Sequence, residues 1–197
     1  MIIKKLEDTE KWLEERKGKI TGTKLKDIIV KRGTGQKIGF FKLIAERIAI
    51  PADDENPMER GIRLEEEALE RFEKETGKKL IKELVMWQRE DTEEIAYSPD
   101  GYTENLKEVA DAKCPNSENF LKAYITQDWS DYEDQVLQAF CVNEELETFY
   151  LIFYDPRLPL DFFYFTIKRD KEKVEKYLDY QKEVLKEVEE WIKKLTF

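Results

Sequence analysis

The sequence contains no histidine and only two cysteines among its 197 residues. Without histidine, imidazole can serve neither as a general base nor as a metal ligand, so any bound metal must be held by oxygen. Two widely separated cysteines, Cys114 and Cys141, make neither a disulfide framework nor a four-thiolate iron–sulfur cluster. We therefore expect two reduced, buried thiols and exclude histidine-based acid–base chemistry.

Long hydrophobic runs are also missing. No apolar stretch approaches the roughly 20 residues that a membrane-spanning helix requires. The opening Met1–Lys5 lacks the apolar run and the small-residue cleavage site of a signal peptide. From these two absences we expect a cytoplasmic protein.

Charged residues are abundant, at 40% of the chain, beside an apolar fraction of 41% that suffices for one domain with a core. The net charge of −10 is unevenly distributed. Residues 1–50 hold 13 lysines and arginines against 7 acidic residues, whereas residues 51–150 hold 11 against 27. The N-terminal segment is therefore the candidate for phosphate contact, and the middle of the chain holds the candidate acids.

Hydrophobic periodicity and capping signals predict alternating helices and strands. One helix begins at Asn56-Pro57 and ends before Gly77. The other predicted helices cover residues 6–16, 23–31, 40–48, 117–125, 130–143 and 170–195, and the predicted strands cover 80–87, 94–98, 107–113, 147–154 and 162–168. This order predicts one α/β domain with a central mixed β-sheet and helices on both faces. We expect the helix over 170–195 to pack on the sheet rather than form a coiled coil.

The most informative motif is Ser98-Pro99-Asp100-Gly101, followed after nine intervening residues by Asp111-Ala112-Lys113-Cys114-Pro115. In a strand, Asp111 and Lys113 share one face, and the preceding turn is expected to bring Asp100 beside them. Two carboxylates provide the oxygen ligands that a hard cation such as Mg²⁺ requires. A lysine beside that cation can hold or activate an attacking water. The combination is typical of phosphodiester hydrolysis and predicts a DNA nuclease.

Three further elements accompany this motif in a fixed order. They are Trp12-x-x-x-Arg16-x-Gly18-x-Ile20-Thr21-x-Thr23, Gly61-x-x-x-Glu65-x-x-Ala68, and Tyr132-x-x-Gln135-x-x-Gln138. Together the four elements resemble the lambda-type exonucleases, also called the YqaJ-like viral recombinase family, within the PD-(D/E)xK nuclease superfamily. The resemblance runs from about Trp12 to Pro156. It implies a nuclease-like core over about 56–168, preceded by a helical DNA-end-binding segment over about 1–50 and followed by an amphipathic helix over about 170–195.

The resemblance also implies a role for each matching residue. Asp100 is expected to be the main metal ligand and Asp111 the second, with Glu65 reaching the metal and the carbonyl of Ala112 adding a ligand. Lys113 is expected to orient or deprotonate the nucleophilic water. Gln135 matches a glutamine near the scissile phosphate, and Tyr132, one turn earlier, is expected to assist it. The implied cofactor is Mg²⁺, and Mn²⁺ is expected to substitute for it. Many family members carry glutamate at the position of Asp111.

A second group of residues is implied to bind the 5′-phosphate of a DNA end. Arg16, Thr23 and Ser98 stand at the matching positions, and a guanidinium with two hydroxyls suits phosphate oxygens. Two alternatives stay open: Thr23 is equally well explained as a helix N-cap, and Arg16 is explained, less well than by phosphate binding, as an exposed cation at a helix end. The basic loop Lys31–Lys37 either contacts the DNA backbone or is a solvated linker.

The function implied is a Mg²⁺-dependent 5′→3′ exonuclease that degrades one strand of linear double-stranded DNA and leaves 3′ overhangs for recombination by single-strand annealing. The resemblance further implies a ring-shaped homotrimer, a single-strand-annealing partner protein, and a phage or prophage origin in a bacterial host. A non-catalytic DNA-end-binding module and an endonuclease of the same superfamily are the alternatives. A CRISPR-type helper nuclease is disfavoured, because such nucleases usually resemble four-cysteine cluster proteins and this chain has only two cysteines.

Overall fold

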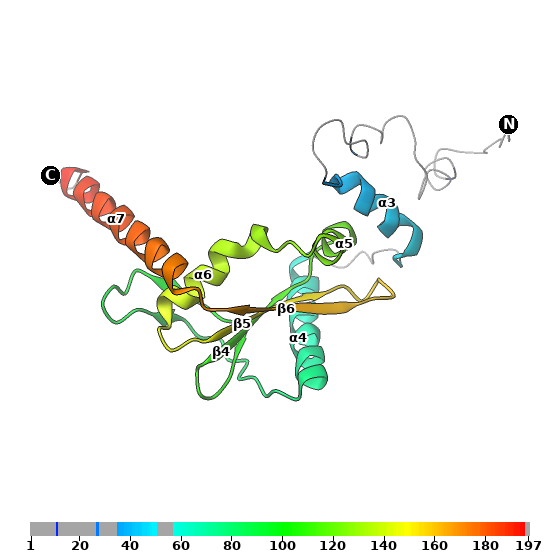
Figure 1. Ribbon diagram of the computed structural model, residues 1–197, viewed down its shortest axis with the longest axis horizontal. Helices are drawn as coiled ribbons and strands as arrows, with labels where there is room; N and C mark the ends of the chain where they lie inside the picture. The colour runs from blue at the N-terminus through cyan, green and yellow to red at the C-terminus, as the bar shows by residue number, and fades with distance from the viewer. Residues whose placement is uncertain (1–10, 12–26, 28–34, 51–56, 196–197) are drawn as a thin grey trace. The chain divides into compact units, whose positions relative to one another are not determined.

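The computed structural model describes residues 11, 27, 35–50 and 57–195 (Figure 1). Apart from residues 11 and 27, the helices predicted over 6–16 and 23–31 therefore lie outside the described residues, as do Arg16 and Thr23. The described helices are α3 (Ile38–Ile48), α4 (Pro57–Thr76), α5 (Ser117–Thr126), the short 3₁₀ helix η1 (Ser130–Tyr132), α6 (Glu133–Val142) and α7 (Lys171–Leu195). The strands are β1 (Trp87–Gln88), β2 (Ala96–Tyr97), β3 (Gly101–Tyr102), β4 (Glu108–Lys113), β5 (Thr148–Tyr154) and β6 (Phe162–Lys168).

Contacts divide the chain into two compact units. The first consists of Met1–Leu64, Cys114–Asp128 and Phe153–Phe163, and the second of Glu65–Lys113, Trp129–Ile152 and Tyr164–Phe197. Every described candidate catalytic residue belongs to the second unit.

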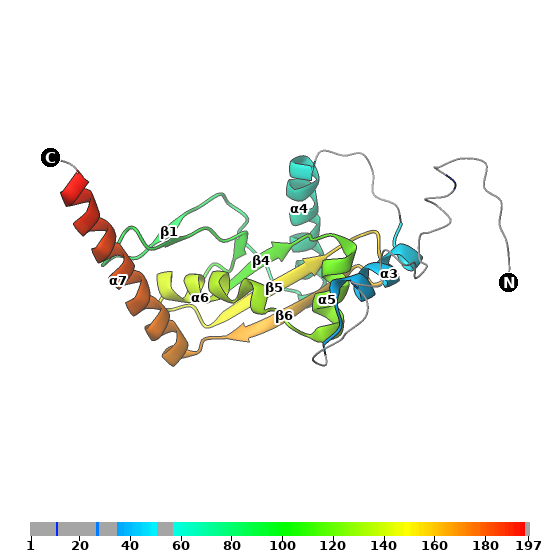
Figure 2. The ribbon, with the colours of Figure 1, turned by 90° about the horizontal axis from the view of Figure 1, so that it is seen from above.

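The main sheet has four strands in the order β3-β4-β5-β6. β3 and β4 are antiparallel, with Gly101 opposite Ala110 and Tyr102 opposite Val109. In Figure 2 the arrows of β4 and β5 point the same way, whereas the arrow of β6 points the opposite way. The sheet is therefore mixed, as the sequence predicted.

The central strand β5 shows how helices cover the sheet. All of its residues except Tyr154 are buried, and successive side chains point to opposite faces. The ring of Phe149 lies 6.4 Å from that of Phe140 on α6, and the ring of Tyr150 lies 4.9 Å from that of Phe72 on α4. Because neighbouring residues contact different helices, α6 and α4 cover opposite faces. This confirms the predicted α/β architecture with helices on both faces.

The strands before the main sheet are shorter than predicted. The strand expected over 80–87 is reduced to an isolated bridge between Ile81 and Tyr102 and to the two-residue β1, which pairs with β2. Between these points Leu84 and Met86 are exposed by 104% and 68%, so their side chains have no core to enter. β-branched and aliphatic composition raised the expectation of a strand, but a strand needs a partner for its backbone. β3, by contrast, was not predicted.

The final helix, α7, packs against α6 rather than on the sheet, which corrects the expectation from sequence. Val174 in its first turn is 4% exposed, and the Cys141 thiol on α6 lies 3.6 Å from the Val174 carbonyl oxygen. Farther along, Val184 and Val188 are 41% and 46% exposed. Burial of the apolar stripe therefore decreases along the helix, from Val174 through the half-buried Leu178 and Leu185 to the exposed Val188.

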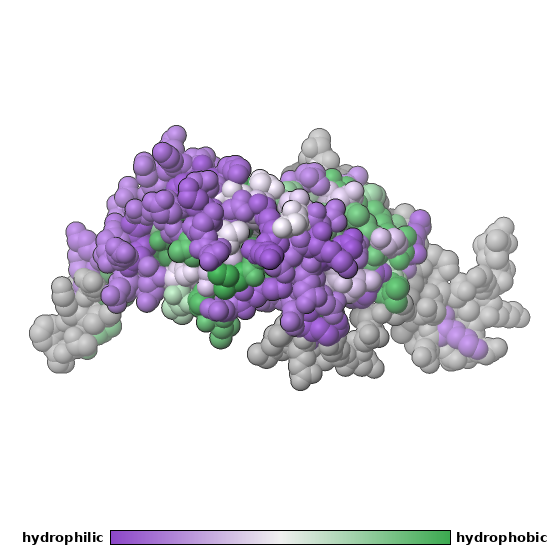
Figure 3. All heavy atoms as spheres, turned by 90° about the horizontal axis from the view of Figure 1, so that it is seen from below, coloured by the Kyte–Doolittle hydropathy of each residue, from purple (hydrophilic) through white to green (hydrophobic). Residues whose placement is uncertain are grey.

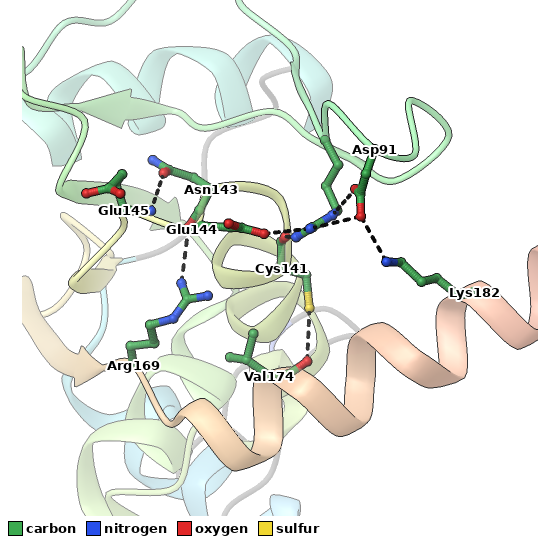
Figure 4. Close-up of polar contacts among 9 residues, drawn as sticks. Asp91, Cys141, Asn143, Glu144, Glu145, Arg169, Val174 and Lys182 are labelled. Atoms are coloured by element: carbon green, nitrogen blue, oxygen red, sulfur yellow. Dashed lines mark hydrogen bonds and ion pairs between the residues drawn. The ribbon is translucent and has the colours of Figure 1, made fainter.

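Polar contacts around a buried arginine and its partner Asp91 join three segments of the second unit (Figure 4). The Arg89 guanidinium, 8% exposed, donates to the Cys141 carbonyl at the end of α6 and to the Glu144 carboxylate at 2.6 Å. It also pairs with Asp91 at 2.7 Å, and Asp91 accepts from Lys182 of α7 at 2.9 Å. We call these five residues the Arg89 cluster.

In the first unit, α3 packs on α5, with Phe41 and Phe120 fully buried. Asp155, at the end of β5, is also fully buried and accepts hydrogen bonds from Ser117 and from the Arg157 guanidinium. Burial alone would raise the pKa of Asp155, but these hydrogen bonds lower it below its usual value. Within the sequence Tyr154-Asp155-Pro156-Arg157, the ion pair between Asp155 and Arg157 thus fixes the end of β5.

Hydrophilic side chains cover most of the face shown in Figure 3, with hydrophobic surface confined to separate patches. None of the described helices is both long enough and apolar enough to cross a membrane.

Candidate active site

The turn before β3 and the pairing of β3 with β4 bring the two key acids together. Gly101 lies opposite Ala110, so one residue farther along the ladder Asp100 meets Asp111. The Asp100 carboxylate accepts the backbone N–H of Ala112 at 2.8 Å, which fixes the turn to the strand. A β-carbon on Gly101 would lie 3.1 Å from Leu80 Cδ1, so the close approach of the turn favours glycine there.

Asp111 is the centre of the site. Its side chain is fully buried and accepts from three donors. Lys113 Nζ lies 3.1 Å from Asp111 Oδ2, as expected for alternate residues on one face of β4, and the Gln135 amide of α6 donates to the same oxygen. The Tyr97 hydroxyl donates to Oδ1 at 3.1 Å.

Helices α4 and α6 contribute the remaining candidates. Lys113 Nζ lies 5.8 Å from the centre of the Tyr132 ring, just before α6, in a cation–π contact. Glu65 on α4 has a raised pKa because it is partly buried and because it faces the Asp111 carboxylate, with Lys113 opposing the shift. Glu65 is therefore close enough to interact electrostatically with both Asp111 and Lys113 of β4.

The charges of the site are crowded. Burial and the neighbouring Asp111 raise the pKa of Asp100 to about 8, and Glu65 adds to the effect. Burial and Asp111 also raise the pKa of the Tyr97 hydroxyl well above its usual value, so that it stays a hydrogen-bond donor. Three carboxylates facing one ammonium leave an excess of negative charge that a divalent cation would neutralise.

The donor set therefore suits Mg²⁺ chemically. Oδ2 of Asp111 accepts from Lys113 and Gln135, and Oδ2 of Asp100 accepts from the Ala112 N–H. Among the residues that the structure describes, no group of three or more acidic or cysteine side chains is already arranged to hold a metal ion. Metal binding would bring a carboxylate oxygen of Asp100 and one of Glu65 toward the Asp111 carboxylate.

The structure thus brings together most of the predicted site. Glu65, Asp100, Asp111, Lys113 and Gln135 form one polar cluster, with Ala112 and Tyr132 beside it. The Ser98 hydroxyl, predicted to bind phosphate, instead donates to the Val85 carbonyl in the present arrangement. Gln138 donates to the Ala96 carbonyl at 3.0 Å and has a structural role.

Sequence reasoning missed Tyr97. It directly precedes the Ser-Pro-Asp-Gly turn, and that adjacency was the one available signal. Its contact with Asp111, fourteen positions later, depends on how β2 is placed beside β4, which no local pattern reveals.

A cavity of about 600 Å³ lies elsewhere, beside the Arg89 cluster. Its lining includes Trp87, Leu106 and four acidic side chains but none of the candidate catalytic residues.

The fold is shared with alkaline exonucleases. The chain is similar to the crystal structure of LHK-Exo in complex with dAMP, at 24% identity and a TM-score of 0.60, over 95% of this chain and 98% of that one. It is similar to a second structure of this alkaline exonuclease, from Laribacter hongkongensis, at 23% identity and a TM-score of 0.60, over 94% and 97% of the two chains. No curated protein matches the chain.

The family follows from the sequence match. Residues 11–143 match the model of the YqaJ-like viral recombinase domain, and the chain belongs to this family. This confirms the resemblance found in the four ordered motifs. The matched range contains Glu65, Asp100, Asp111, Lys113 and Gln135, so the polar cluster lies within the part of the chain that defines the family.

Proposed function

We propose that this protein is a Mg²⁺-dependent 5′→3′ exonuclease that degrades one strand of linear double-stranded DNA and leaves 3′ overhangs for single-strand annealing. The observation that carries the proposal is the convergence of Asp100, Asp111 and Lys113 on one buried polar cluster. Membership in the viral recombinase family and the alkaline exonuclease fold support a nuclease. The direction of digestion and the substrate rest on the family resemblance.

In this proposal Asp100, Asp111, Glu65 and the Ala112 carbonyl hold the cation. A bound divalent metal lowers the pKa of its water and neutralises charge on the phosphate. Lys113 supplies a positive charge where negative charge develops and orients the attacking water. Gln135, held against Asp111, donates toward the scissile phosphate, and Tyr132 keeps the Lys113 ammonium in place. Mn²⁺ is expected to substitute for Mg²⁺.

Selection of DNA ends is assigned to Arg16, Thr23 and Ser98. Ser98 is exposed and lies two positions before Asp100 in the sequence. A phosphate bound by Ser98 would therefore lie close to the catalytic cluster. Its hydroxyl hydrogen would have to leave the Val85 carbonyl in order to donate to the phosphate. We further propose a single-strand-annealing partner protein and a cytoplasmic, phage-derived setting.

The test is digestion of three DNA substrates with Mg²⁺: linear duplex with 5′-phosphate ends, linear duplex with 5′-hydroxyl ends, and a closed circle. We expect nucleotide release from the 5′-phosphorylated duplex, faster than from the 5′-hydroxyl duplex, and none from the circle or in EDTA. Lys113→Ala should lower the rate about 100-fold, because a positioned positive charge is lost. Lys122→Ala, a charge removal on α5, is the control and should retain full activity.

Each contrary outcome has a distinct meaning. Cleavage of the circle would identify an endonuclease. Binding of phosphorylated ends without Mg²⁺-dependent cleavage would identify a DNA-end-binding module. Full activity of Lys113→Ala would remove the catalytic role of the cluster.

A further inference from the structure

Tyr97 contacts the centre of the site but takes no part in the reaction proposed above. Its side chain is 6% exposed, and its hydroxyl donates to Oδ1 of the fully buried Asp111 at 3.1 Å. Its ring cannot easily turn away, because the Trp87 ring lies 6.1 Å and the Phe149 ring 6.4 Å from it. Trp87 is also the residue opposite Tyr97 in the pairing of β1 with β2. The hydroxyl is therefore presented to Asp111 by a rigid support.

The two oxygens of Asp111 are used differently. An ionised carboxylate has about four lone-pair sites, two on each oxygen. Oδ2 accepts from both Lys113 and Gln135, so its sites are filled. Among the described residues Tyr97 is the single donor to Oδ1, which keeps one lone pair unused. The chain thus leaves one particular oxygen of this acid able to take a cation.

Resting on the proposed function, we propose that Tyr97 is a positioning residue for the metal site: its hydroxyl fixes the rotation of the Asp111 carboxylate and reserves Oδ1 for the divalent cation. Residues that hydrogen-bond to metal ligands orient them, and their loss typically weakens metal binding by about 10- to 100-fold. Without the Tyr97 hydroxyl, Oδ2 of Asp111 would still accept from Lys113 and Gln135, but no donor would hold Oδ1 in a fixed position.

The experiment compares Tyr97→Phe with Tyr150→Phe in the full chain. Tyr150 is a matched control, because it is also 6% exposed and its hydroxyl also donates to a carboxylate at 3.1 Å, that of Glu108 outside the catalytic cluster. Both variants remove one buried hydroxyl and keep the ring. Mn²⁺ binding is measured by isothermal titration calorimetry without DNA, and thermal unfolding is measured in EDTA.

We expect Tyr97→Phe to weaken Mn²⁺ binding at least 10-fold, Tyr150→Phe to leave it within about twofold, and the two unfolding temperatures in EDTA to fall by similar amounts. Equal Mn²⁺ affinity in the wild type and Tyr97→Phe would overturn the inference while leaving the nuclease proposal standing. A wild type that binds no Mn²⁺ overturns both. If Mn²⁺ binds as expected but neither the wild type nor either variant shows nuclease activity, only the proposed function is overturned.

Discussion

The surroundings of Asp100 disfavour the ionised form of its carboxyl group. It lies partly buried beside Asp111, and this combination raises its pKa to about 8 from an ordinary value of 3.8. Between these two pH values the folded chain keeps a proton that the unfolded chain has lost. The contribution of Asp100 to stability is therefore fully present below pH 3.8 and is lost as the pH rises toward about 8.

Replacing Asp100 by asparagine should remove this pH-dependent penalty while retaining an oxygen for the Ala112 N–H. We expect the unfolding temperature of Asp100→Asn in EDTA to exceed that of the wild type by several degrees at pH 8.5 and by much less at pH 5. The measurement is differential scanning fluorimetry across this range. The same variant should lose nuclease activity, so stability and activity would move in opposite directions.

Asp91 is the control for that experiment. Hydrogen bonds from Arg89 and then Lys182 hold the pKa of Asp91 well below its usual value, so it is charged at both pH values. Asp91→Asn should lower the unfolding temperature at pH 5 and pH 8.5 alike. If the difference in unfolding temperature between Asp100→Asn and the wild type does not change with pH, burial and neighbouring charges do not destabilise the ionised form of Asp100.

At the scale of elements, the Arg89 cluster connects the β1–β2 hairpin to the end of α6 and, through Asp91 and Lys182, to α7 (Figure 4). The cluster matters because α7 buries only the beginning of its apolar stripe. A buried guanidinium with several partners is costly to remove, since its partners, the Cys141 carbonyl above all, lose their donors.

We expect Arg89→Ala to reduce the free energy of unfolding by about 2 kcal/mol, because the buried Cys141 carbonyl is left without its donor. Urea unfolding followed by circular dichroism measures the change. The control is Lys107→Ala, which breaks an ion pair of similar length, 2.7 Å to Glu147, between side chains that are 46% and 62% exposed. That exposed pair should contribute far less to stability than the Arg89 cluster, because water and salt screen it. Equal effects of the two substitutions would contradict a special role for the cluster.

The elements also differ in how well local sequence predicts them. β5 was predicted to within a residue because its aromatic and β-branched run is buried on both faces. The segment 80–87 is also largely apolar, yet it forms only a bridge at Ile81 and the start of β1 at Trp87, because no neighbouring strand pairs with the rest of it. Composition indicates strand propensity, whereas pairing depends on what lies beside the segment.

At the scale of the whole molecule, the negative net charge of −10 argues against tight non-specific binding of DNA by a single chain. A ring of subunits around the duplex, as the family resemblance implies, would offset this by enclosing the substrate. Large apolar side chains that are exposed in the single chain, including Ile50, Leu84, Met86 and Tyr180, are available for subunit contacts.

We therefore expect a homotrimer in solution, with a mass three times the chain mass of 23.6 kDa. Sedimentation velocity at micromolar concentration measures this mass. Leu84→Glu in combination with Met86→Glu is expected to shift the distribution toward smaller species if this exposed segment lies in the interface. A monomer at micromolar concentration in the unmodified protein would contradict the ring.

The sequence by itself determined the family, the order of the longer helices and strands, and the prediction that Asp100, Asp111 and Lys113 lie together, because these depend on local spacing. The pairing of Asp111 with Lys113 follows directly from the period of two in a strand. Only the tertiary structure placed Tyr97 on Asp111, raised the pKa of Asp100, and packed α7 on α6 instead of on the sheet. These features arise where segments distant in the sequence exclude water from one another, and burial and charge then act between groups that no local pattern connects.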